Sequence, residues 1–157
     1  MTEQPPGFVL PLRLIMAFRA IVDEVHAELA DQGHPDVRPL FGFVFQAIGP
    51  HGTTAADLAR ALGVSKQAAG KTIATLADLG YVAVSPDPGD ARRKLVNLTP
   101  HGVDCLVRTN RAFDAIRDRW VDRLGAERVR ALDADLGRMA PGDVFRLDMP
   151  GWFGGAG

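Results

Sequence analysis

The spacing of apolar residues changes twice along the sequence, and this change constrains the fold more than any other feature. Before Leu79 and after Thr99, apolar side chains recur every three or four residues, which is the pattern of amphipathic helices. Between these parts, Tyr81–Ser85 and Lys94–Leu98 have the residue types of strands, and Pro86–Asp90 has those of a turn. The sequence therefore predicts a mainly α fold with one β-hairpin set between helices.

Long and short helices are predicted in different places. Residues 8–30 and 100–139 form long amphipathic segments, the second with one break. Residues 36–48 are apolar on nearly every side, which predicts a central, largely buried helix. Two short helices follow, one ending at Leu62 and one spanning Lys66–Leu79. Short helices joined by so tight a turn are typical of a helix–turn–helix.

The ends of the two short helices carry capping residues. Thr54, with Asp57 three residues later, resembles a capping box for the first helix. Gly63 is expected to end that helix and Ser65 to cap the second one. The inner face of the second helix is predicted to hold Ala69, Ile73 and Leu76, and its outer face Lys66, Gln67, Gly70, Lys71 and Ala74.

Basic residues are concentrated in the middle of the sequence, although the protein as a whole is not basic. Its 18 Lys and Arg and 19 Asp and Glu give a net charge of −1, which excludes binding to nucleic acid through bulk positive charge. Between Leu58 and Ala77, however, there are three basic residues and no acidic one. Arg92, Arg93 and Lys94 add three more at the expected tip of the hairpin. Local positive charge of this kind is what contact with phosphates requires.

Composition also bears on other classes of protein. A single cysteine excludes a disulfide framework and a multi-cysteine zinc site. The sequence has no uncharged apolar run of about 18 residues, so no membrane span is expected. Because its first residues lack the basic start of a secretory signal, we expect a cytoplasmic protein. Catalytic and phosphate-binding motifs are missing, and we expect no catalytic site, no cofactor and no bound metal.

A helix–turn–helix followed by a basic hairpin predicts a winged helix–turn–helix that binds duplex DNA. A helix fits the major groove, and its outward side chains reach the base edges. The contacts expected there, to guanine, adenine or phosphate, come from Lys66, Gln67 and Lys71. Arg92 is expected to lie along the adjacent minor groove, because narrow grooves attract arginine. Further phosphate contacts are expected from Thr54, Ser65, Arg93 and Lys94.

Residues 90–102, DARRKLVNLTPHG, resemble the wing signature D-x-R-x-K-x-V-x-L-T-x-x-G of the MarR family of transcriptional regulators. Residues 58–67, LARALGVSKQ, are similar to the helix–turn–helix of the same family. The order and length of the helices match over roughly residues 8–140. The resemblance implies that Asp90 braces the side chain of Arg92. Many members have Ser or Thr followed by Arg where this chain has Gly70 and Lys71, so base contacts there depart from the family's pattern.

The resemblance also implies a homodimer, palindromic operators and, often, small aromatic effectors that release DNA. Dimerisation follows independently from the residues, because a helix–turn–helix unit is too small to cover the apolar faces of the long terminal helices. We therefore divide the chain into a helical dimerisation region, residues 1–35 and 100–157, and a winged helix–turn–helix DNA-binding domain, residues 36–99. The expected function is a DNA-binding transcriptional regulator, and we expect a repressor.

Two other functions stay open from the sequence. One is a winged-helix module that binds protein and not DNA, and the other is a small-molecule-binding protein with vestigial DNA contact. An effector pocket could be lined by Phe18, Phe41, Phe43, Phe45 and Trp120, with His26 or Arg19 as a polar contact. Aromatic residues at helical spacing more often belong to a core.

Two residues could suggest other chemistry. Cys105 could sense oxidants, but we expect a buried structural cysteine. His101 and Cys105 have the spacing of two metal ligands, but no dense cluster of histidine or acidic residues accompanies them. The carboxylates of Asp114, Asp118 and Asp122 are interspersed with arginines, which predicts a salt-bridged surface and not a catalytic pair.

Overall fold

The computed structural model describes residues 4–38, 40–140 and 142, and every structural statement below concerns these residues. In chain order, the helices and strands are α1 (Val9–Asp31), α2 (Phe41–Ile48), β1 (Thr53–Thr54), α3 (Ala55–Leu62), α4 (Lys66–Asp78), β2 (Val82–Asp87), β3 (Asp90–Leu98), α5 (Pro100–Leu124) and α6 (Ala126–Met139). The mainly α class is confirmed. No described helix is both long enough and apolar enough to cross a membrane.

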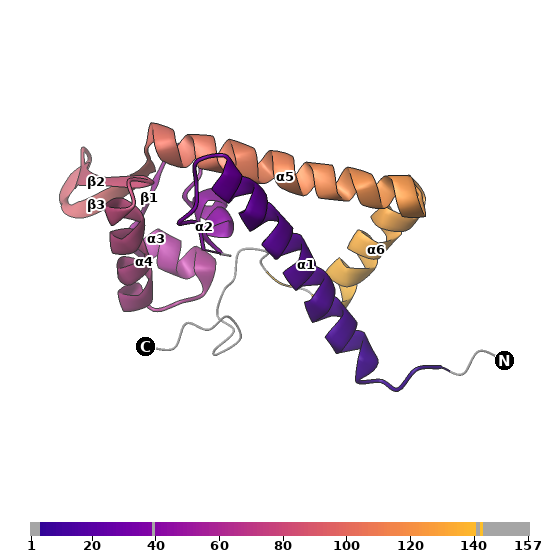
Figure 1. The fold of residues 1–157 in the computed structure, drawn as a ribbon. Helices are drawn as coiled ribbons and strands as arrows, with labels where there is room; N and C mark the ends of the chain where they lie inside the picture. Colours follow the sequence, from indigo (N-terminus) through magenta and orange to yellow (C-terminus); the bar gives the residue numbers. More distant parts are fainter. Residues whose placement is uncertain (1–3, 39, 141, 143–157) are drawn as a thin grey trace.

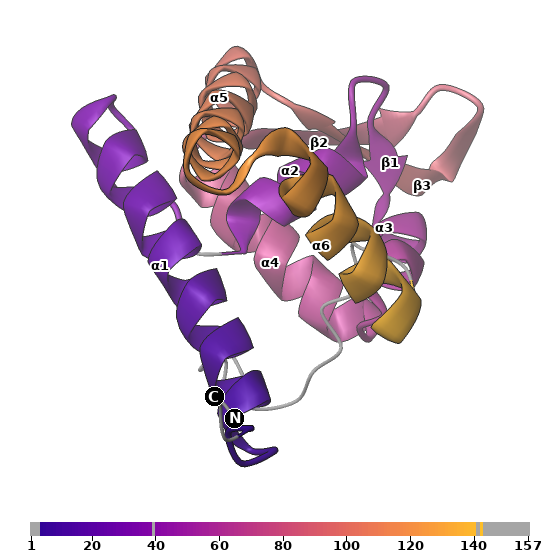
Figure 2. The ribbon, with the colours of Figure 1, turned by 90° about the vertical axis from the view of Figure 1, so that its right-hand side faces the viewer.

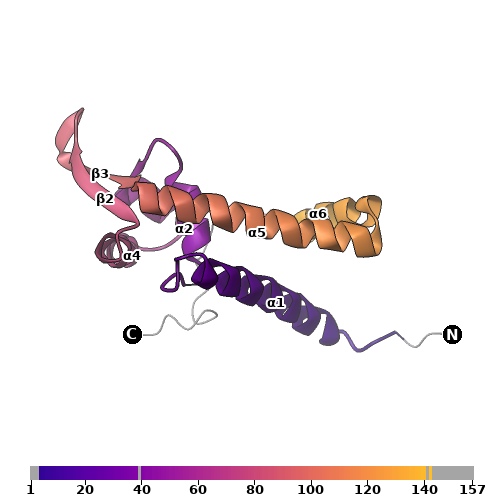
Figure 3. The same cartoon turned by 45° about the horizontal axis from the view of Figure 1, so that its top comes forward.

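The short and long elements occupy different parts of the molecule. Figure 1 shows α2, α3, α4 and the strands gathered at one end of α5, with α6 at its other end. α1 packs against α5, and both run away from the strands (Figure 3). Figure 2, which looks nearly along α5, shows α1 on one side of that helix and α6 on the other. We call residues 41–98 the lobe, and α1, α5 and α6 the stem.

One apolar core joins the lobe to the stem. Phe45 of α2 and Leu58 of α3 are fully buried within it. The same cluster takes in buried residues of the stem, namely Val25, Leu29, Cys105, Ala112 and Ile116. The lobe is therefore not packed as a separate unit, and its orientation depends on contacts with α1 and α5.

The predicted helix caps are confirmed. Thr54 Oγ1 accepts a hydrogen bond from the Asp57 N–H at 3.1 Å, and Ser65 Oγ accepts one from the Ala68 N–H at 3.1 Å. Gly63 has φ of 66°, a left-handed conformation that favours glycine at a helix end. These local interactions fix where α3 ends and α4 begins, and so fix the direction of α4.

The second helix is shorter than predicted. α2 begins at Phe41 and not at Asp36, and the Phe41 N–H donates to the Arg38 carbonyl at 3.0 Å. The sequence reason is Pro39, because a proline disfavours helical backbone at the residue before it. The expected burial of this helix is confirmed at Phe41, Val44, Phe45 and Ile48.

The strands of the hairpin are longer than predicted and its turn is shorter, and a third strand joins it. β1 pairs with β3, so the sheet is antiparallel with the order β1–β3–β2. We call β2, β3 and the turn between them, Pro88–Gly89, the wing. Pro86 pairs with Lys94 and Asp87 with Asp90, so residues 91–93 face no residue of β2 and form a bulge. The prediction placed Arg92, Arg93 and Lys94 at the tip of the hairpin. In the structure they lie on β3, beside the turn.

Candidate nucleic-acid interface

The two faces of α4 differ in burial as the sequence predicts. Ala69, Ile73 and Leu76 are buried against the rest of the lobe. Lys66, Gln67, Gly70, Lys71 and Ala74 are exposed, and we call these five residues the reading face. At Gly70 no atom lies within 4 Å of the position that a Cβ would occupy. Packing within the chain therefore does not require glycine there.

The two capping hydroxyls are available to an outside ligand to different degrees. Ser65 is exposed, and its hydroxyl oxygen accepts the cap bond while its own hydrogen is left to donate. Thr54 is buried, and its hydroxyl donates to Asp57 Oδ2 at 2.7 Å besides accepting from the Asp57 N–H. The geometry therefore favours Ser65 for a phosphate contact, whereas Thr54 is used within the fold.

The acidic residues of the wing hold its turn in shape. Asp87 Oδ1 accepts a hydrogen bond from the Gly89 N–H at 2.8 Å, and Asp90 Oδ1 accepts one from the Arg92 N–H at 3.0 Å. Asp90 thus contacts the main chain of Arg92, whereas the resemblance implies a contact with its side chain. Both Arg92 and Lys94 are exposed, and no ion pair of either is found within the described residues.

Arg93 connects the wing to the helix–turn–helix. Its guanidinium lies 3.6 Å from Asp57 Oδ2 in the first turn of α3, and Arg60 pairs with the other oxygen of the same carboxylate. Asp57 also receives the hydroxyl of Thr54. The sequence predicts the Thr54–Asp57 contact but not the ion pair with Arg93, because nothing local relates residues 57 and 93. This ion pair connects the wing to α3.

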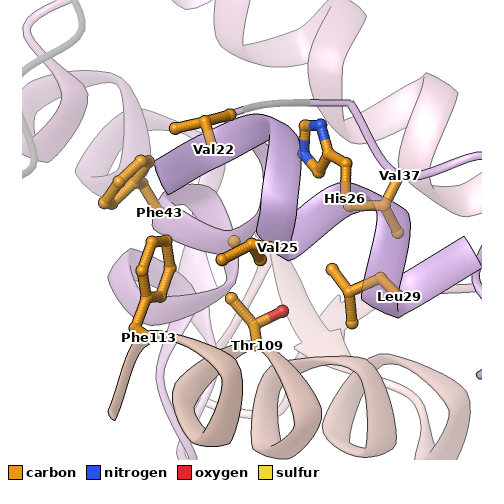
Figure 4. A pocket seen from close by; sticks show the side chains of 9 residues that line it. Val22, Val25, His26, Leu29, Val37, Phe43, Thr109 and Phe113 are labelled. Carbon is orange, nitrogen blue, oxygen red and sulfur yellow. The ribbon is translucent and has the colours of Figure 1, made fainter. Parts of the chain in front are cut away.

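A small pocket lies between α1, α2 and α5, with a cavity volume of about 10 Å³, enough for about one water molecule. Figure 4 shows Phe43, Phe113 and His26 among its lining side chains. Burial lowers the pKa of His26, although the Arg38 carbonyl and Asp23 oppose this shift. Of the five aromatic residues considered for a pocket, Phe43 lines this one, whereas Phe41 and Phe45 are buried in the core and Trp120 packs against it.

Cys105 is fully buried, as predicted for a structural cysteine. Burial is the main cause that raises the pKa of its thiol to about 11. The ring of His101 stacks on that of Tyr81, with centroids 4.5 Å apart. In the part of the chain that the structure describes, no group of three or more His, Cys, Asp or Glu residues could hold a metal ion. Arg117 pairs with Asp114 and Asp118, as expected for a salt-bridged surface.

One polar cluster was not identified from the sequence. His34 is buried and lies within hydrogen-bonding distance of both Tyr81 and Asp104. The three residues are separated by 47 and 70 positions in the chain, so no spacing rule could have connected them. The available signal was a lone histidine beside Gly33 and Pro35, which looks like an ordinary turn residue.

Comparison with known families bears on the lobe. The sequence model of the MarR family matches residues 44–93, which extend from α2 to the bulge of β3. The match covers 50 of the 157 residues, so this part of the chain is similar to the MarR family. The matched MarR region contains the helix–turn–helix, the reading face and the basic bulge of the wing. A comparison with curated protein sequences gives no match.

Solved structures of MarR-family proteins resemble the whole fold. The transcriptional repressor CouR bound to a 23-mer DNA duplex aligns with a TM-score of 0.69 and 21% identity, covering 88% of this chain and 99% of CouR. Apo MarR from E. coli gives 0.61 and 22%, with 88% and 99% covered. A mutant of S. aureus MepR bound to an oligodeoxyribonucleotide gives 0.57 and 21%, with 86% and 96% covered. The chain therefore has the MarR fold, stem included.

Proposed function

We propose that this protein is a DNA-binding transcriptional regulator that acts as a repressor. The observation that carries the proposal is the exposed reading face of α4, which holds two lysines and a glutamine and no acidic residue, beside a wing whose carboxylates bind its own main chain. A helix with this face can enter a major groove, and an arginine of the wing can reach the minor groove. The CouR and MepR structures, which contain DNA, support this use of the fold.

The residues of the interface have different proposed roles. Lys66, Gln67 and Lys71 contact base edges or phosphates in the major groove, and Gly70 lets the backbone of α4 approach the DNA closely. Ser65 donates its hydroxyl hydrogen to a phosphate. In the wing, Arg92 enters the minor groove and Lys94 contacts a phosphate. Arg93 contacts a phosphate while its ion pair with Asp57 keeps the wing in place.

Selection of bound sequences from a random pool of duplex DNA tests this proposal. A dimer with two reading faces should select a palindrome whose half-sites are about one helical turn, roughly 34 Å, apart. The affinity for that sequence should fall steeply with salt, because lysines and arginines displace counterions from phosphates. If no sequence is enriched and the protein binds another protein or a small molecule instead, the proposal is wrong.

A substitution in the wing provides a sharper test. Arg92→Ala should weaken operator binding by about 1–3 kcal/mol and leave the oligomeric state unchanged. Arg130→Ala is a matched control, because Arg130 is also exposed but lies on α6, at the other end of α5 from the wing. Operator binding by Arg92→Ala at wild-type affinity would show that the wing does not contact DNA as proposed.

We also propose that the protein is a homodimer formed through its stem. Exposed large apolar side chains are numerous there, namely Phe8, Leu10, Leu12, Leu14, Met16, Leu124, Leu132, Leu136 and Met139. α6 buries none of its residues within one chain. Apolar surface of this extent is typical of an interface, and a second copy with the same surface can cover it.

The mass in solution, measured by light scattering on a sizing column, tests the dimer. Leu136→Asp places a charge on the exposed apolar side of α6 and should shift the protein towards monomer. Arg130→Asp, on the same helix, changes charge without removing apolar surface and should leave the dimer intact. A wild-type protein that is monomeric at all concentrations would contradict the proposed interface.

Finally, we propose that a small aromatic compound binds in the pocket between α1, α2 and α5 and releases DNA. Phe43 and Phe113 pack on each other with ring centroids 5.9 Å apart and provide an aromatic wall, and His26 provides a polar group. The cavity holds about one water molecule, so an aromatic ligand must displace lining side chains to enter. The pocket joins the stem to the lobe, so a ligand there can favour one orientation of the lobe. Calorimetric titration with single-ring aromatic acids, with and without operator DNA, tests the coupling. Equal affinity in both conditions would refute release.

A further inference from the structure

A buried histidine connects the lobe to the stem. His34 lies between α1 and α2 in the chain and is 2% exposed. Its Nε2 is 2.9 Å from Asp104 Oδ2 on α5, and its Nδ1 is 3.1 Å from the hydroxyl oxygen of Tyr81, which lies between α4 and β2. The imidazole therefore joins the stem to the point where the helix that carries the reading face meets the wing. We call Asp104, His34 and Tyr81 the triad.

The direction of each hydrogen bond in the triad follows from the chemistry of its members. The Arg108 Nε–H, which donates to Asp104 Oδ2 at 2.8 Å, is the main cause that lowers the pKa of Asp104, and the bond with His34 adds to it. An ionised Asp104 can only accept, so Nε2 of His34 carries a hydrogen and donates it. In a neutral imidazole Nδ1 then accepts, and the Tyr81 hydroxyl donates to it. Burial raises the pKa of Tyr81 to about 12, so the hydroxyl keeps its proton.

Tyr81 passes the position of the triad on to the helix and the wing. Its N–H donates to the Leu76 carbonyl at the end of α4, at 2.9 Å, and its carbonyl accepts from the Thr99 N–H at the end of β3, at 3.0 Å. A displacement of the Tyr81 ring therefore affects both DNA-contacting elements, although Tyr81 itself is buried and cannot touch DNA.

We propose that the Asp104–His34–Tyr81 triad positions α4 and the wing on the stem, and that protonation of His34 weakens its contact with Tyr81 and thereby weakens DNA binding. The inference rests on the proposed function. In a protonated His34, Nδ1 carries a hydrogen that the Tyr81 hydroxyl oxygen can accept only by turning its own hydrogen away, and among the described residues that hydroxyl has no other hydrogen-bond partner. One buried donor is then left without an acceptor, which is unfavourable in the buried site.

Several other titratable groups surround His34. Its own segment contributes Asp36, and α5 contributes Cys105, Arg108 and His101 besides Asp104. From α1, Glu28 is connected through Gln32, which accepts from Arg108. α2 packs Phe45 against Tyr81 and has no titratable side chain. Asp104 favours a charged His34, and the ring of His101 lies against it with its centroid 4.5 Å away.

The test is the affinity for the selected operator between about pH 7.5 and about pH 5.5, the range in which imidazoles titrate. For the wild type, the loss of one net hydrogen bond predicts an affinity about fivefold weaker at the acid end. Tyr81→Phe keeps the ring and its stacking but removes the hydroxyl. We expect this variant to bind about fivefold more weakly at the neutral end and to lose the acid step. His51→Gln, at an exposed histidine outside the triad, is the control and should keep the wild-type profile.

Asp104→Asn provides a second, independent variant at a half-exposed side chain. The amide can still accept from Nε2 but no longer stabilises a cation, so the acid step should move to lower pH. A merely structural contribution would lower affinity equally at every pH. Parallel profiles for the wild type and Tyr81→Phe, or an unmoved step in Asp104→Asn, would overturn the proposal. If Tyr81→Phe does not fold, the Asp104→Asn profile decides.

Hydrogen exchange of the free protein separates this proposal from the proposed function. The amides of Tyr81 and Thr99 are protected by the main-chain hydrogen bonds described above. After correction for intrinsic exchange, these amides should lose protection in acid in the wild type. In Tyr81→Phe their protection should not change with pH. If the wild type binds no DNA, the proposed function fails, and this exchange measurement alone decides whether the contact between His34 and Tyr81 weakens. Unchanged protection in the wild type would refute it.

Discussion

Alanine substitutions at three helical glycines are expected to change the free energy of unfolding in graded ways. A Cβ on Gly102, in the first turn of α5, would lie closer than 3 Å to the Tyr81 carbonyl oxygen and 3.1 Å from its carbonyl carbon. A Cβ on Gly42 would lie 2.9 Å from Thr109 Cγ2. A Cβ on Gly70 would meet nothing within 4 Å. The three sites therefore differ in what must move, namely backbone, side chain or nothing.

The magnitudes follow from these contacts. Gly70→Ala should stabilise the protein by up to about 1 kcal/mol, because alanine is the better residue in the middle of an exposed helix. Gly102→Ala should destabilise it by roughly 1–3 kcal/mol for overpacking. The free energy of unfolding of Gly102→Ala should fall by about 1 kcal/mol more if the Tyr81 carbonyl loses its hydrogen bond with the Thr99 N–H. Gly42→Ala should fall between these limits, because the Thr109 side chain can shift more easily than a backbone.

Urea unfolding followed by circular dichroism measures the free energy of unfolding of the three variants. All samples need the same protein concentration, because the stability of a dimer depends on concentration. Gly137→Ala on α6 is the matched control for Gly70→Ala, since it too meets nothing within 4 Å and should stabilise the protein to a similar degree. The reasoning fails if Gly102→Ala is as stable as the wild type, or if Gly70→Ala is destabilised. Operator binding then shows whether Gly70 is needed for close approach, since Gly137→Ala should not affect it.

Three further results are expected. Thr54→Ala should lower the free energy of unfolding by about 1 kcal/mol through loss of the α3 cap, and an unchanged urea midpoint would contradict this. Because the pKa of Cys105 is raised to about 11, its buried thiol should stay neutral at pH 8 and react with a disulfide reagent only after unfolding. Rapid labelling of the native protein would contradict the burial of Cys105. Asp57→Asn should cost less than about 1 kcal/mol, since its ion pairs are exposed, yet speed hydrogen exchange in the wing, which Arg93→Ala should reproduce.

Local features of this protein could be predicted from the sequence, because each depends on neighbours a few residues away. The caps at Thr54 and Ser65 and the left-handed Gly63 are where the residue types place them. The burial of Ala69, Ile73 and Leu76 follows from helical period alone. For the same reason the separation of the reading face from the core could be predicted without coordinates.

The sequence-based predictions fail where the structure depends on contacts between distant segments or on small irregularities of the backbone. β1 has two residues, and its strand conformation exists because it pairs with Val96 and Leu95, more than 40 positions away. The bulge at residues 91–93 moves the arginines off the tip of the wing, and no alternation of residue types signals it. The Arg93–Asp57 pair and the His34 triad are long-range contacts that spacing rules do not reach.

The wing signature also has a different meaning in the structure from the one that its charges suggest. Asp90 holds the main chain of the bulge, Thr99 caps α5, and Gly102 makes room for the Tyr81 carbonyl, so these residues shape the wing and its attachment. Arg93 is engaged with Asp57. Of the charged residues, Arg92 and Lys94 are left facing outwards. A match to the signature therefore supports the fold more directly than it supports DNA contact, and the comparison of Arg92→Ala with its control on α6 is the experiment that separates the two.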